Sequence, residues 1–319
     1  SAENVIFTSG CTEALNLAII GTHKKNGHII STIYEHNSVL RPLNELKKIY
    51  KENITFLSPD INGKIDLEKF EQSINDNTYM ISCIFTSNVT GYSNEIEKIG
   101  QICKKHNLLF LVDCAQSAGH EKIDMQKMNI DFLSIAGHKG FYATTGIGAL
   151  LVSDKAKEHL NPIKFGGTGT QSNSIIQPKD FPDGFESGTC NVPGILSLGA
   201  GLKFVQKHQN KINEKIKNLT VYLHQKLKQI DNITIYPNNN FNSGVISFNL
   251  FGIPSNEVGN FLSENYNICV RTGLHCAPLV HKNFNTLETG MVRVSLSYFN
   301  KKRDIDKLIN ALKNFKYQI

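Results

Sequence analysis

The sequence lacks the features that mark membrane and exported proteins. No uninterrupted apolar stretch is long enough to span a bilayer, and no signal-peptide pattern opens the chain. We therefore expect no membrane partner. The chain begins at Ser1 rather than Met and enters a strand-like run at once, so we expect its N-terminus to be truncated or processed.

Paired cysteine motifs are also lacking. The chain has 7 cysteines, an odd number, and no C-x-x-C pair. Cys83, Cys103 and Cys114 lie inside apolar runs, where a free thiol behaves as a small hydrophobic group. This pattern favours a reducing compartment and predicts a cytoplasmic protein.

A strong charge imbalance is missing as well. Lysine and arginine total 34 against 28 aspartates and glutamates, a net charge of +6 that is modest for 319 residues. The lysines are scattered along helical stretches such as Lys211 to Lys228, without interleaved aromatic residues. Solvated helix faces explain this better than a nucleic-acid groove, so no nucleic-acid partner is expected.

What is present is a globular composition, with 40% hydrophobic and 19% charged residues. The first two-thirds alternates strand and helix signals, and its apolar runs show no period of two. Such runs, separated by helices, predict a mainly parallel sheet with helices on both faces. Strands are expected at 5–8, 29–33, 54–57, 79–85, 108–112, 132–136 and 146–152, and helices from Thr12 and at 66–74 and 95–106.

The last third has a different pattern. A long helical signal at 193–230 is interpreted as a connector into a second domain. We predict a large domain at 1–205 and a smaller α+β domain at 206–319. Within the small domain, strands are expected at 233–236, 245–250, 268–271 and 292–296, and helices at 256–264 and 304–315.

The decapeptide from Asp131 to Gly140 combines a buried strand with a chemical group. Its apolar run ends in Gly137-His138-Lys139-Gly140. Glycines permit close backbone approach, and ligands of open α/β sheets bind at the carboxyl ends of strands. A lysine withdrawn from water there has a lowered pKa and can form a Schiff base. The alternative is a strand-end lysine that reaches back to water.

Other polar residues also follow directly after predicted strands. Each has a local alternative: a helix cap for Thr12 or Asp113, a loop histidine for His36, a turn residue for Asn88. Because the carboxyl ends of parallel strands share one edge, together they form one constellation. Its members are Thr12, His36, Asn88, Asp113, Gln116, His138 and Lys139.

Pyridoxal phosphate chemistry requires a lysine amine, a carboxylate and a phosphate-binding group of amides and hydroxyls, and this sheet edge offers all three. A lysine would hold the aldehyde, a carboxylate would pair with the pyridine nitrogen, and helix-terminal amides and hydroxyls would bind the phosphate. The competing phosphate motif G-x-x-x-x-G-K-[ST] is absent. The glycines at 166–169 lack the strand-turn-helix context of a dinucleotide site and are expected to form a flexible loop.

A second cluster runs from Arg271 to Pro278 and contains His275 and Cys276. The cysteine could be a reactive thiolate whose ionisation the imidazole and the arginine favour. It could instead form half of a metal site with His281, but no second cysteine lies at ligand spacing, so no metal is expected.

Arg293 interrupts an otherwise apolar strand and therefore needs an anionic partner. A substrate carboxylate or a structural acid would serve.

Seven motifs in this order resemble the cysteine desulfurases of the class V aminotransferase family. The form Arg-x-Gly-x-His-Cys-Ala is similar to the group that contains the SufS-type desulfurases and selenocysteine lyases. The likeness covers essentially the whole chain. The motifs are Thr8-Ser9-Gly10-Cys11-Thr12-Glu13-Ala14, Glu35-His36-Asn37, Ser87-Asn88-Val89-Thr90-Gly91, Val112-Asp113-Cys114-Ala115-Gln116, Gly137-His138-Lys139, Phe185-Glu186-Ser187-Gly188-Thr189 and Arg271-Thr272-Gly273-Leu274-His275-Cys276.

The resemblance implies a fold type I pyridoxal 5'-phosphate enzyme and a role for each matching residue. Lys139 would hold the cofactor as a Schiff base and then transfer protons, and Cys276 would attack the substrate sulfur, leaving a persulfide and releasing alanine. The remaining implied contacts are His36 stacked on the ring, Asp113 on the pyridine nitrogen, Gln116 on the ring hydroxyl, Thr12 and His138 on the phosphate, Thr189 from the partner of a homodimer, Asn88 at the cofactor and substrate, and Arg293 with Arg271 at the substrate carboxylate.

Three departures from the family pattern accompany the likeness. Relatives often carry Ser or Thr where Ala136 stands, so one phosphate hydroxyl is expected to be missing. Cys114 replaces a Gly or Ala and is expected to serve packing only. Relatives also carry a segment before the first motif, and its absence would remove part of the small domain and leave the activity of this chain in question.

The leading hypothesis is thus a cysteine desulfurase, which would pass sulfur to an acceptor protein, for instance in iron–sulfur cluster assembly. One alternative keeps the cofactor but changes the substrate, as in a selenocysteine lyase, a cysteine-sulfinate lyase or an aminotransferase. Transamination needs no thiol, so Cys276 argues against it. A non-enzyme alternative is an inactive cofactor-binding protein that relays sulfur.

Overall fold

The computed structural model describes residues 1–315, which fold into two compact units. The large unit comprises residues 1–59, 65–85 and 94–207. The small unit comprises residues 60–64, 86–93 and those from 208 onward. The short segment 86–93, which contains Asn88, thus belongs to the small unit although large-unit segments flank it.

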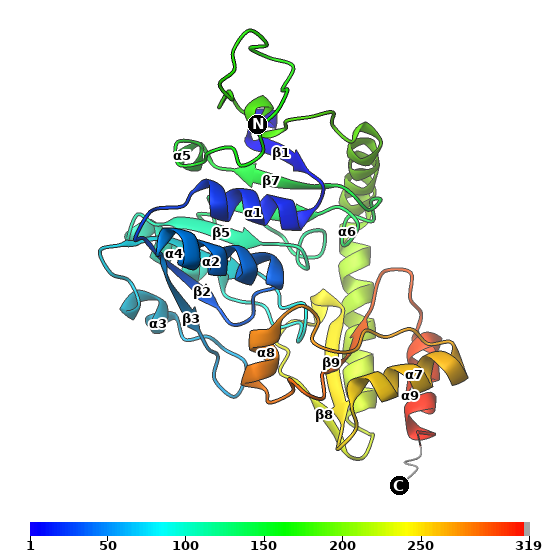
Figure 1. Cartoon of the computed structure of the whole chain (residues 1–319). Coiled ribbons are helices and arrows are strands. Elements are labelled where there is room, and N and C mark those ends of the chain that lie inside the picture. Colours follow the sequence, from blue (N-terminus) through cyan, green and yellow to red (C-terminus); the bar gives the residue numbers. More distant parts are fainter. Residues whose placement is uncertain (316–319) are drawn as a thin grey trace. The chain divides into compact units, whose positions relative to one another are not determined.

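The large unit is built on a seven-stranded sheet in the order β1-β7-β6-β5-β4-β2-β3 (Figure 1). Strand β7 runs antiparallel to both of its neighbours, and all other adjacent pairs are parallel. This confirms the predicted α/β fold with a mainly parallel sheet. The strands are β1 (Val5–Thr8), β2 (His28–Thr32), β3 (Asn53–Leu57), β4 (Thr78–Ile84), β5 (Leu109–Asp113), β6 (Phe132–Ala136) and β7 (Gly148–Val152).

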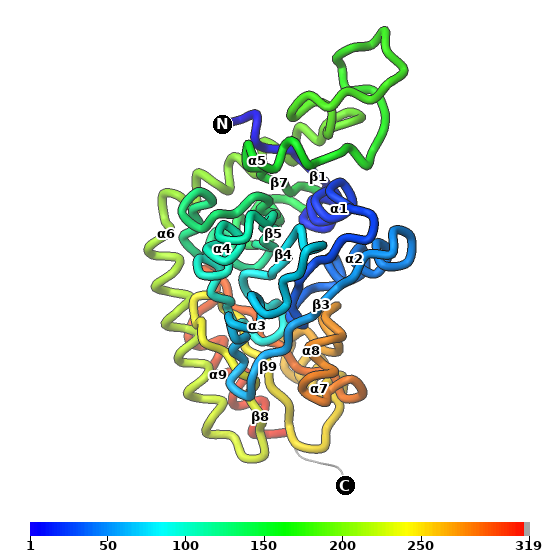
Figure 2. The backbone as a smooth tube through the Cα atoms, turned by 90° about the vertical axis from the view of Figure 1, so that its left-hand side faces the viewer, coloured from blue at the N-terminus to red at the C-terminus, as the bar shows by residue number. Residues whose placement is uncertain are grey.

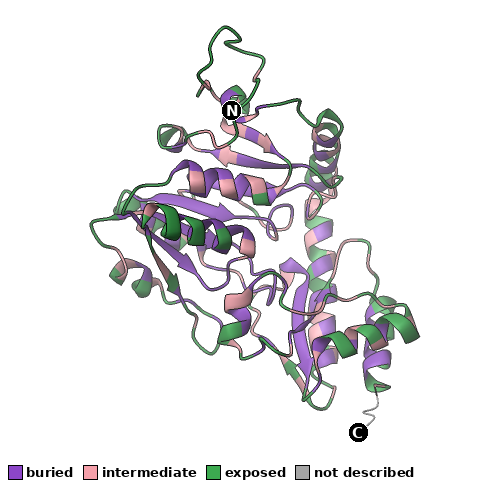
Figure 3. Ribbon diagram, viewed as in Figure 1, coloured by how far each residue is buried: buried purple, intermediate pink, exposed green. Residues whose placement is uncertain are grey.

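Helices cover both faces of this sheet. In Figure 2, α1 and α2 lie on one side of the strands and α4 on the other. Buried residues fill the strands and the inner helix faces, and the outer helix faces are exposed (Figure 3). The helices of the large unit are α1 (Cys11–Gly21), α2 (Asn37–Tyr50), α3 (Leu67–Gln72), α4 (Ile96–Lys105) and α5 (Asp154–Lys157), with short 3-10 turns η1 (Ala2–Asn4) and η2 (Asp183–Phe185).

Helix α6 (Val192–Leu227) contains the boundary between the units, after Lys207. The small unit has a three-stranded antiparallel sheet in the order β10-β9-β8, whose core includes Phe248, Val258 and Ile309. Its elements are β8 (Ile233–Ile235), η3 (Phe241–Ser243), β9 (Val245–Leu250), α7 (Ser255–Tyr266), α8 (Pro278–Asn283), β10 (Val292–Ser295) and α9 (Lys302–Lys313).

Two expectations about secondary structure need correction. The strand predicted at 268–271 is wrong, because only Arg271 pairs with β10, through an isolated bridge to Arg293. Helix α2 was not expected from the sequence, and it contains Pro42, a residue that normally ends a helix.

Between α5 and α6 the chain is irregular apart from η2, and Figure 2 shows much of this segment extending beyond β1 and β7 of the same unit. It contains the glycines at 166–169 and three exposed apolar side chains, those of Phe165, Ile175 and Ile176. In the part of the chain that is described, no helix has the length and apolar character needed to cross a membrane.

Candidate active site

The large unit gathers several of the predicted site residues at one edge of its sheet. Asp113 is the last residue of β5 and pairs with Ser134 of β6 and Ile84 of β4. Because these strands are parallel, their carboxyl ends share an edge with the starts of α1 and α2, which follow β1 and β2. The residues brought there are Thr12, His36, Asp113, Gln116, His138 and Lys139.

Two glycines fix the turn that carries Lys139. A Cβ on Gly140 would lie 2.0 Å from the carbonyl oxygen of Ala118, and one on Gly137 would lie 2.8 Å from the Ile147 side chain. The turn therefore packs its backbone directly on the loop that follows Asp113, as the sequence predicted from the flanking glycines. Lys139 is half-buried, and its Nζ makes no hydrogen bond or ion pair with any of residues 1–315.

Asp113 is buried and held on one side only. Its Oδ1 accepts from the Ala115 amide at 2.8 Å and from the Cys11 thiol at 3.4 Å, and Cys11 Sγ also lies 3.3 Å from Ser134 Oγ. Within the described chain Oδ2 has no such partner. Burial and then Asp113 raise the pKa of Cys11, and the Lys139 charge opposes them. Cys11 therefore stays a thiol that can donate, and it senses both charges of the site.

Thr12 and His36 are linked through Ser38. Ser38 Oγ lies 2.8 Å from Thr12 Oγ1 and 2.9 Å from His36 Nδ1. His36 is the N-cap of α2, and its Nδ1 accepts from the Ser38 amide at 3.1 Å. The N-cap of α1 is Gly10, and no side chain of the described residues caps that helix. The first-turn amides beside Thr12 are therefore open to an anion.

Three other predicted residues occupy more open positions. Gln116 is half-buried, and His138 lies on the surface. Partial burial and the neighbouring Lys139 lower the pKa of His138, so its imidazole is neutral at pH 7. Thr189 is exposed and lines, with Thr8 and Glu13, a cavity of about 150 Å³.

In the small unit, Cys276 is presented by an unusual turn. Both His275 and Cys276 have left-handed backbones, with φ of 50° and 57°, and Gly273 has φ of 90°. Such angles are uncommon for residues that have a Cβ and mark turns held by their surroundings. Cys276 is exposed on this turn, directly before Ala277 and helix α8.

The His275 side chain holds the turn in place through hydrogen bonds and does not contribute a positive charge. Its side chain is buried, Nε2 donates to the Met291 carbonyl at 3.1 Å, and its own carbonyl accepts from Asn88 Nδ2 at 2.8 Å. Burial, reinforced by Arg293, lowers the pKa of His275 to about 3. The imidazole is therefore neutral and adds no positive charge beside Cys276, so its expected effect on the ionisation of Cys276 stays a prediction.

The positive charge beside Cys276 comes from arginine. Arg293 Nη1 donates to the Asn88 carbonyl at 2.8 Å, while Arg293 Nε and Asn88 Oδ1 are buried without a partner among the described residues. Burial and then Arg271 lower the pKa of Arg293, and Cys276 opposes them. Neither arginine forms an ion pair within residues 1–315. Two neighbouring guanidinium groups without an acid favour binding of an anion.

Asn88 contributes an acceptor to this site. Because its Nδ2 is used by the His275 carbonyl, the atom left open is Oδ1, which suits a hydrogen-bond donor better than a carboxylate. His281 Nδ1 bonds to Thr286 Oγ1 at 2.9 Å. Among residues 1–315, no three His, Cys, Asp or Glu side chains are grouped to hold a metal ion.

The model of the class-V aminotransferases matches residues 1–308. The chain belongs to this family. A probable cysteine desulfurase of Borreliella burgdorferi is 34% identical, over 98% of this chain and 77% of the relative. One of Methanothermobacter thermautotrophicus is 31% identical, over 98% and 79%.

Solved structures agree with this membership. The apo cysteine desulfurase of Thermococcus onnurineus superimposes with a TM-score of 0.91 at 30% identity, over 98% of this chain and 78% of that one. The Escherichia coli cysteine desulfurase CsdA gives 0.89 at 25% identity, over 97% and 78%. The fold of this class-V aminotransferase is therefore fold type I.

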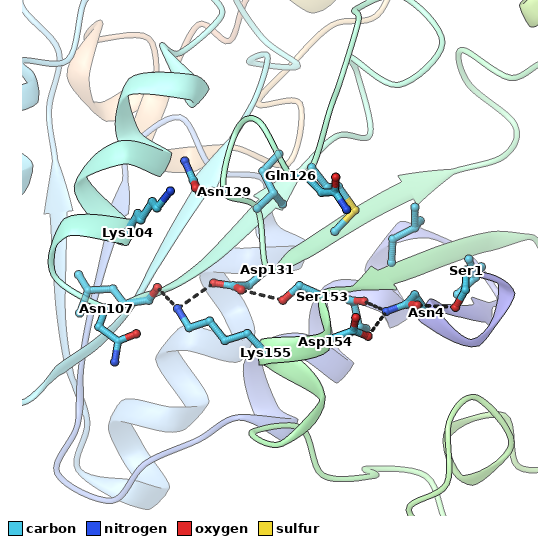
Figure 4. Close-up of a pocket in the computed structure, with 16 residues that line it drawn as sticks. Ser1, Asn4, Lys104, Asn107, Gln126, Asn129, Asp131, Ser153, Asp154 and Lys155 are labelled. Carbon is cyan, nitrogen blue, oxygen red and sulfur yellow. Dashed lines mark hydrogen bonds and ion pairs between the residues drawn. The ribbon is translucent and has the colours of Figure 1, made fainter.

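A cavity of about 560 Å³ lies at the other edge of the same sheet (Figure 4). Leu108 and Asp131, which line it, precede β5 and β6. Asp131 is satisfied by the Ser153 hydroxyl at 2.7 Å, the Phe110 amide at 3.0 Å and Lys155 at 3.5 Å. We interpret these bonds as a structural clamp, remote from the edge that carries Lys139.

Sequence reasoning gave no role to Cys11, Glu35 or Ser38. All three stand in or beside quoted family motifs, so their position was visible. Their partners were not visible, since Cys11 and Asp113 are 102 residues apart. Only the folded arrangement of helices and strands reveals which side chains meet.

Proposed function

We propose that this chain is a pyridoxal-phosphate-dependent cysteine desulfurase that converts cysteine to alanine and carries the sulfur as a persulfide on Cys276. The observation that carries the proposal is Lys139, which is half-buried on the sheet edge of Asp113 and has no hydrogen-bond or ion-pair partner among residues 1–315. The Cys276 turn with its two arginines supports the choice of substrate.

The residues of the large unit fit pyridoxal phosphate. Lys139 has a free amine, Asp113 has an open Oδ2, and Thr12 stands among uncapped helix amides. When bound, the cofactor supplies an aldehyde for an amine and a ring that withdraws electrons from the amino-acid carbon. Gln116 would bond to a ring substituent, as would Asn88 of the small unit, and His138, together with Thr189 of a partner copy, would complete the phosphate site.

Each large-unit side chain then has a limited task. The Asp113 carboxylate, fixed by Ala115 and Cys11, would keep the ring nitrogen protonated. His36, held by the Ser38 amide, would pack on the ring face. Lys139 Nζ would take the proton from the substrate Cα and would return one to Cα after the carbon that becomes the methyl group has taken up its own proton.

The small-unit side chains would handle the sulfur and the carboxylate. Arg293, with Arg271 beside it, would bind the substrate carboxylate. The Cys276 thiolate would form an S–S bond to the substrate sulfur while the Cβ–S bond breaks. The electron pair of that bond stays with carbon, which takes up a proton, so the products are alanine and the persulfide.

The remaining parts of the proposal concern partners and location. We propose a homodimer, supported by the exposed Phe165, Ile175 and Ile176 on the loop that also carries Thr189. An acceptor protein would take the persulfide sulfur from the exposed Cys276. A chain with 7 cysteines and no disulfide in the described structure suits the cytoplasm.

The direct test is the absorption spectrum of the purified protein, recorded before and after addition of cysteine. We expect a visible cofactor band, a spectral change with cysteine, and alanine in equal amount to the transferred sulfur. A colourless protein that takes up no added pyridoxal phosphate would contradict the proposal.

The same assay separates the alternatives. A selenocysteine lyase would turn over selenocysteine much faster than cysteine, and an aminotransferase would need a keto-acid acceptor and produce no persulfide. An inactive relay protein would show the cofactor band without alanine. The exposed Cys276 favours the desulfurase over transamination.

A further inference from the structure

Ser247 is a buried residue of the small unit to which the proposed function gives no task. It lies in β9, and its side chain is fully buried. In the pairing of β9 with β10, Ser247 stands directly opposite Arg293. Directly opposite residues of an antiparallel pair point to the same face of a sheet. Their neighbours Phe248 and Val292 belong to the core, so Ser247 and Arg293 share the other face.

The segment 86–93 is bound on this face through two consecutive carbonyl groups. The Ser247 hydroxyl donates to the Val89 carbonyl. Arg293 Nη1 donates to the carbonyl of the preceding residue, Asn88, at 2.8 Å. Because Ser247 and Arg293 are themselves paired in the sheet, these two bonds close a ring that runs through the backbone of the segment.

The segment is also fixed to the small unit on the far side of this ring. A Cβ on Gly91 would lie 2.6 Å from the Val245 carbonyl, so the segment packs directly on the backbone of β9. Asn239 Oδ1 accepts from the Ser93 amide at 2.8 Å, and Asn239 Nδ2 donates to the Ser93 carbonyl at 3.0 Å. Loss of the Ser247 bond should therefore shift the nearby carbonyls without releasing the whole segment.

Arg293 needs a fixed partner because its neighbour on the other edge of β10 repels it. Arg271 pairs with Arg293 there, and like charges directly opposite each other are unfavourable. The Asn88 carbonyl accepts one guanidinium hydrogen, while Arg293 Nε is buried without a partner among the described residues. Because a guanidinium group holds its hydrogens in a rigid plane, an anchor at Nη1 determines where the remaining donors point.

We propose that Ser247 is a positioning residue for the substrate carboxylate. By holding the Val89 carbonyl, it keeps the adjoining Asn88 carbonyl in place. Arg293, which is bonded to the Asn88 carbonyl, then points its remaining guanidinium hydrogens to the carboxylate. This inference rests on the proposed function, in which Arg293 binds that group. The effect of Ser247 is thus specific to ligands with a carboxylate, whereas a merely structural role would weaken every ligand alike.

The test compares L-alanine with ethylamine, which lacks only the carboxylate, on the cofactor-loaded protein. The measured quantity is the ratio of the two dissociation constants, obtained from the change in cofactor absorption during titration. We expect Ser247→Ala to lower the preference for alanine roughly 3- to 10-fold and to change ethylamine binding less than about 2-fold. An unchanged ratio, or an equal loss of both ligands, would overturn the proposal.

An isosteric pair of variants covers the case that Ser247→Ala does not fold. Ser247→Thr keeps the hydroxyl, Ser247→Val has the same shape without it, and both side chains suit a strand. The ratio for Ser247→Thr should stay within about 3-fold of wild type, whereas Ser247→Val should be as low as we expect for Ser247→Ala. Equal ratios in the two variants would show that the hydroxyl has no such role.

A double variant tests whether Ser247 acts through Arg293. Arg293→Met removes the charge and keeps much of the stem, so adding Ser247→Ala to it should lower the ratio little further. Losses that add fully would contradict a role through Arg293.

Thr220→Val is the matched control. Thr220 is also fully buried in the small unit, and its hydroxyl donates to the Ile216 carbonyl within α6 at 2.7 Å. This variant should lower stability and leave the ratio unchanged. A wild-type protein that takes up no pyridoxal phosphate would refute the proposed function itself. A wild type that binds the cofactor and prefers alanine, with an unchanged ratio in Ser247→Ala, refutes only the role of Ser247.

Discussion

Cys11 Sγ lies 3.4 Å from Asp113 Oδ1, so the carboxylate at the end of β5 receives a hydrogen bond from the first turn of α1. The thiol therefore helps to orient the Asp113 carboxylate. Cys11→Ala removes this hydrogen bond, and we expect about a 2- to 5-fold weaker affinity for the cofactor.

The measurement is the dissociation constant of the cofactor at neutral pH, followed by its absorption. Cys11→Ser keeps a donor and should stay close to wild type. Cys103→Ala, another buried cysteine remote from this site, controls for the lost volume. Equal dissociation constants for Cys11→Ala and wild type would show that the thiol does not support Asp113.

Lys139→Ala should remove the visible band of lysine-bound cofactor and all turnover. The reason is that only the Lys139 amine stands free at the Asp113 edge of the described large unit. Lys155→Ala serves as the control, since Lys155 pairs with Asp131 at the other edge. A band that persists at the wild-type position in Lys139→Ala would contradict the assignment.

A neutral His275 leads to a prediction about how the alkylation rate of Cys276 depends on pH. Since the pKa of His275 is lowered to about 3, the imidazole does not titrate between pH 5 and 8. The rate of Cys276 alkylation by iodoacetamide should therefore show no step near the usual histidine pKa of about 6.5. A Cys276→Ser variant gives the background rate of alkylation. A step in the rate near pH 6.5, roughly the usual histidine pKa, would contradict a neutral His275.

Glu35 should make the large unit less stable as the pH rises. Burial raises the pKa of Glu35 from its usual 4.5 to about 8. The Thr32 hydroxyl and the Ile84 amide both donate to Oε1, whereas Oε2 has no hydrogen-bond partner among the described residues. A carboxyl group with a raised pKa in the folded state binds a proton that the unfolded chain has lost. Its stabilisation is complete below about pH 4.5 and is lost as the pH rises toward 8, by at most about 1.4 kcal/mol per pH unit.

Urea unfolding at several pH values checks this. Glu35→Gln stays neutral, so its stability relative to wild type should increase between pH 5 and 8. Glu158→Gln, on the surface at the amino-end side of the sheet, should show no such trend. Parallel curves for wild type and Glu35→Gln would mean that Glu35 is ionised in the folded protein.

The elements that the sequence predicted best were those with one dominant signal. The strands at 132–136 and 245–250 have their predicted bounds because each is a mainly apolar run that starts or ends beside a glycine, interrupted only by Ser134 in the first and by Ser247 and Asn249 in the second. Helix α2 was missed because Pro42 interrupts its pattern, and α8 because six residues carry little periodicity. The strand expected at 268–271 failed because apolar character does not create a pairing partner.

The site was predictable as a set of residue types but not as a set of bonds. Strand ends predicted that Thr12, Asp113 and Lys139 share an edge, since parallel strands meet there. The sequence could not reveal that Ser38 joins Thr12 to His36, because such contacts depend on the register and crossing of elements far apart in the chain.

The central claim is that Cys276 takes the sulfur. The most direct measurement is the intact mass of the cofactor-loaded protein after reaction with cysteine, together with the alanine formed. We predict that wild type gains the mass of one sulfur atom on Cys276 and releases one alanine, and that Cys276→Ser keeps its cofactor band but gains no sulfur. Sulfur transfer and alanine release at the wild-type rate in Cys276→Ser would contradict the account.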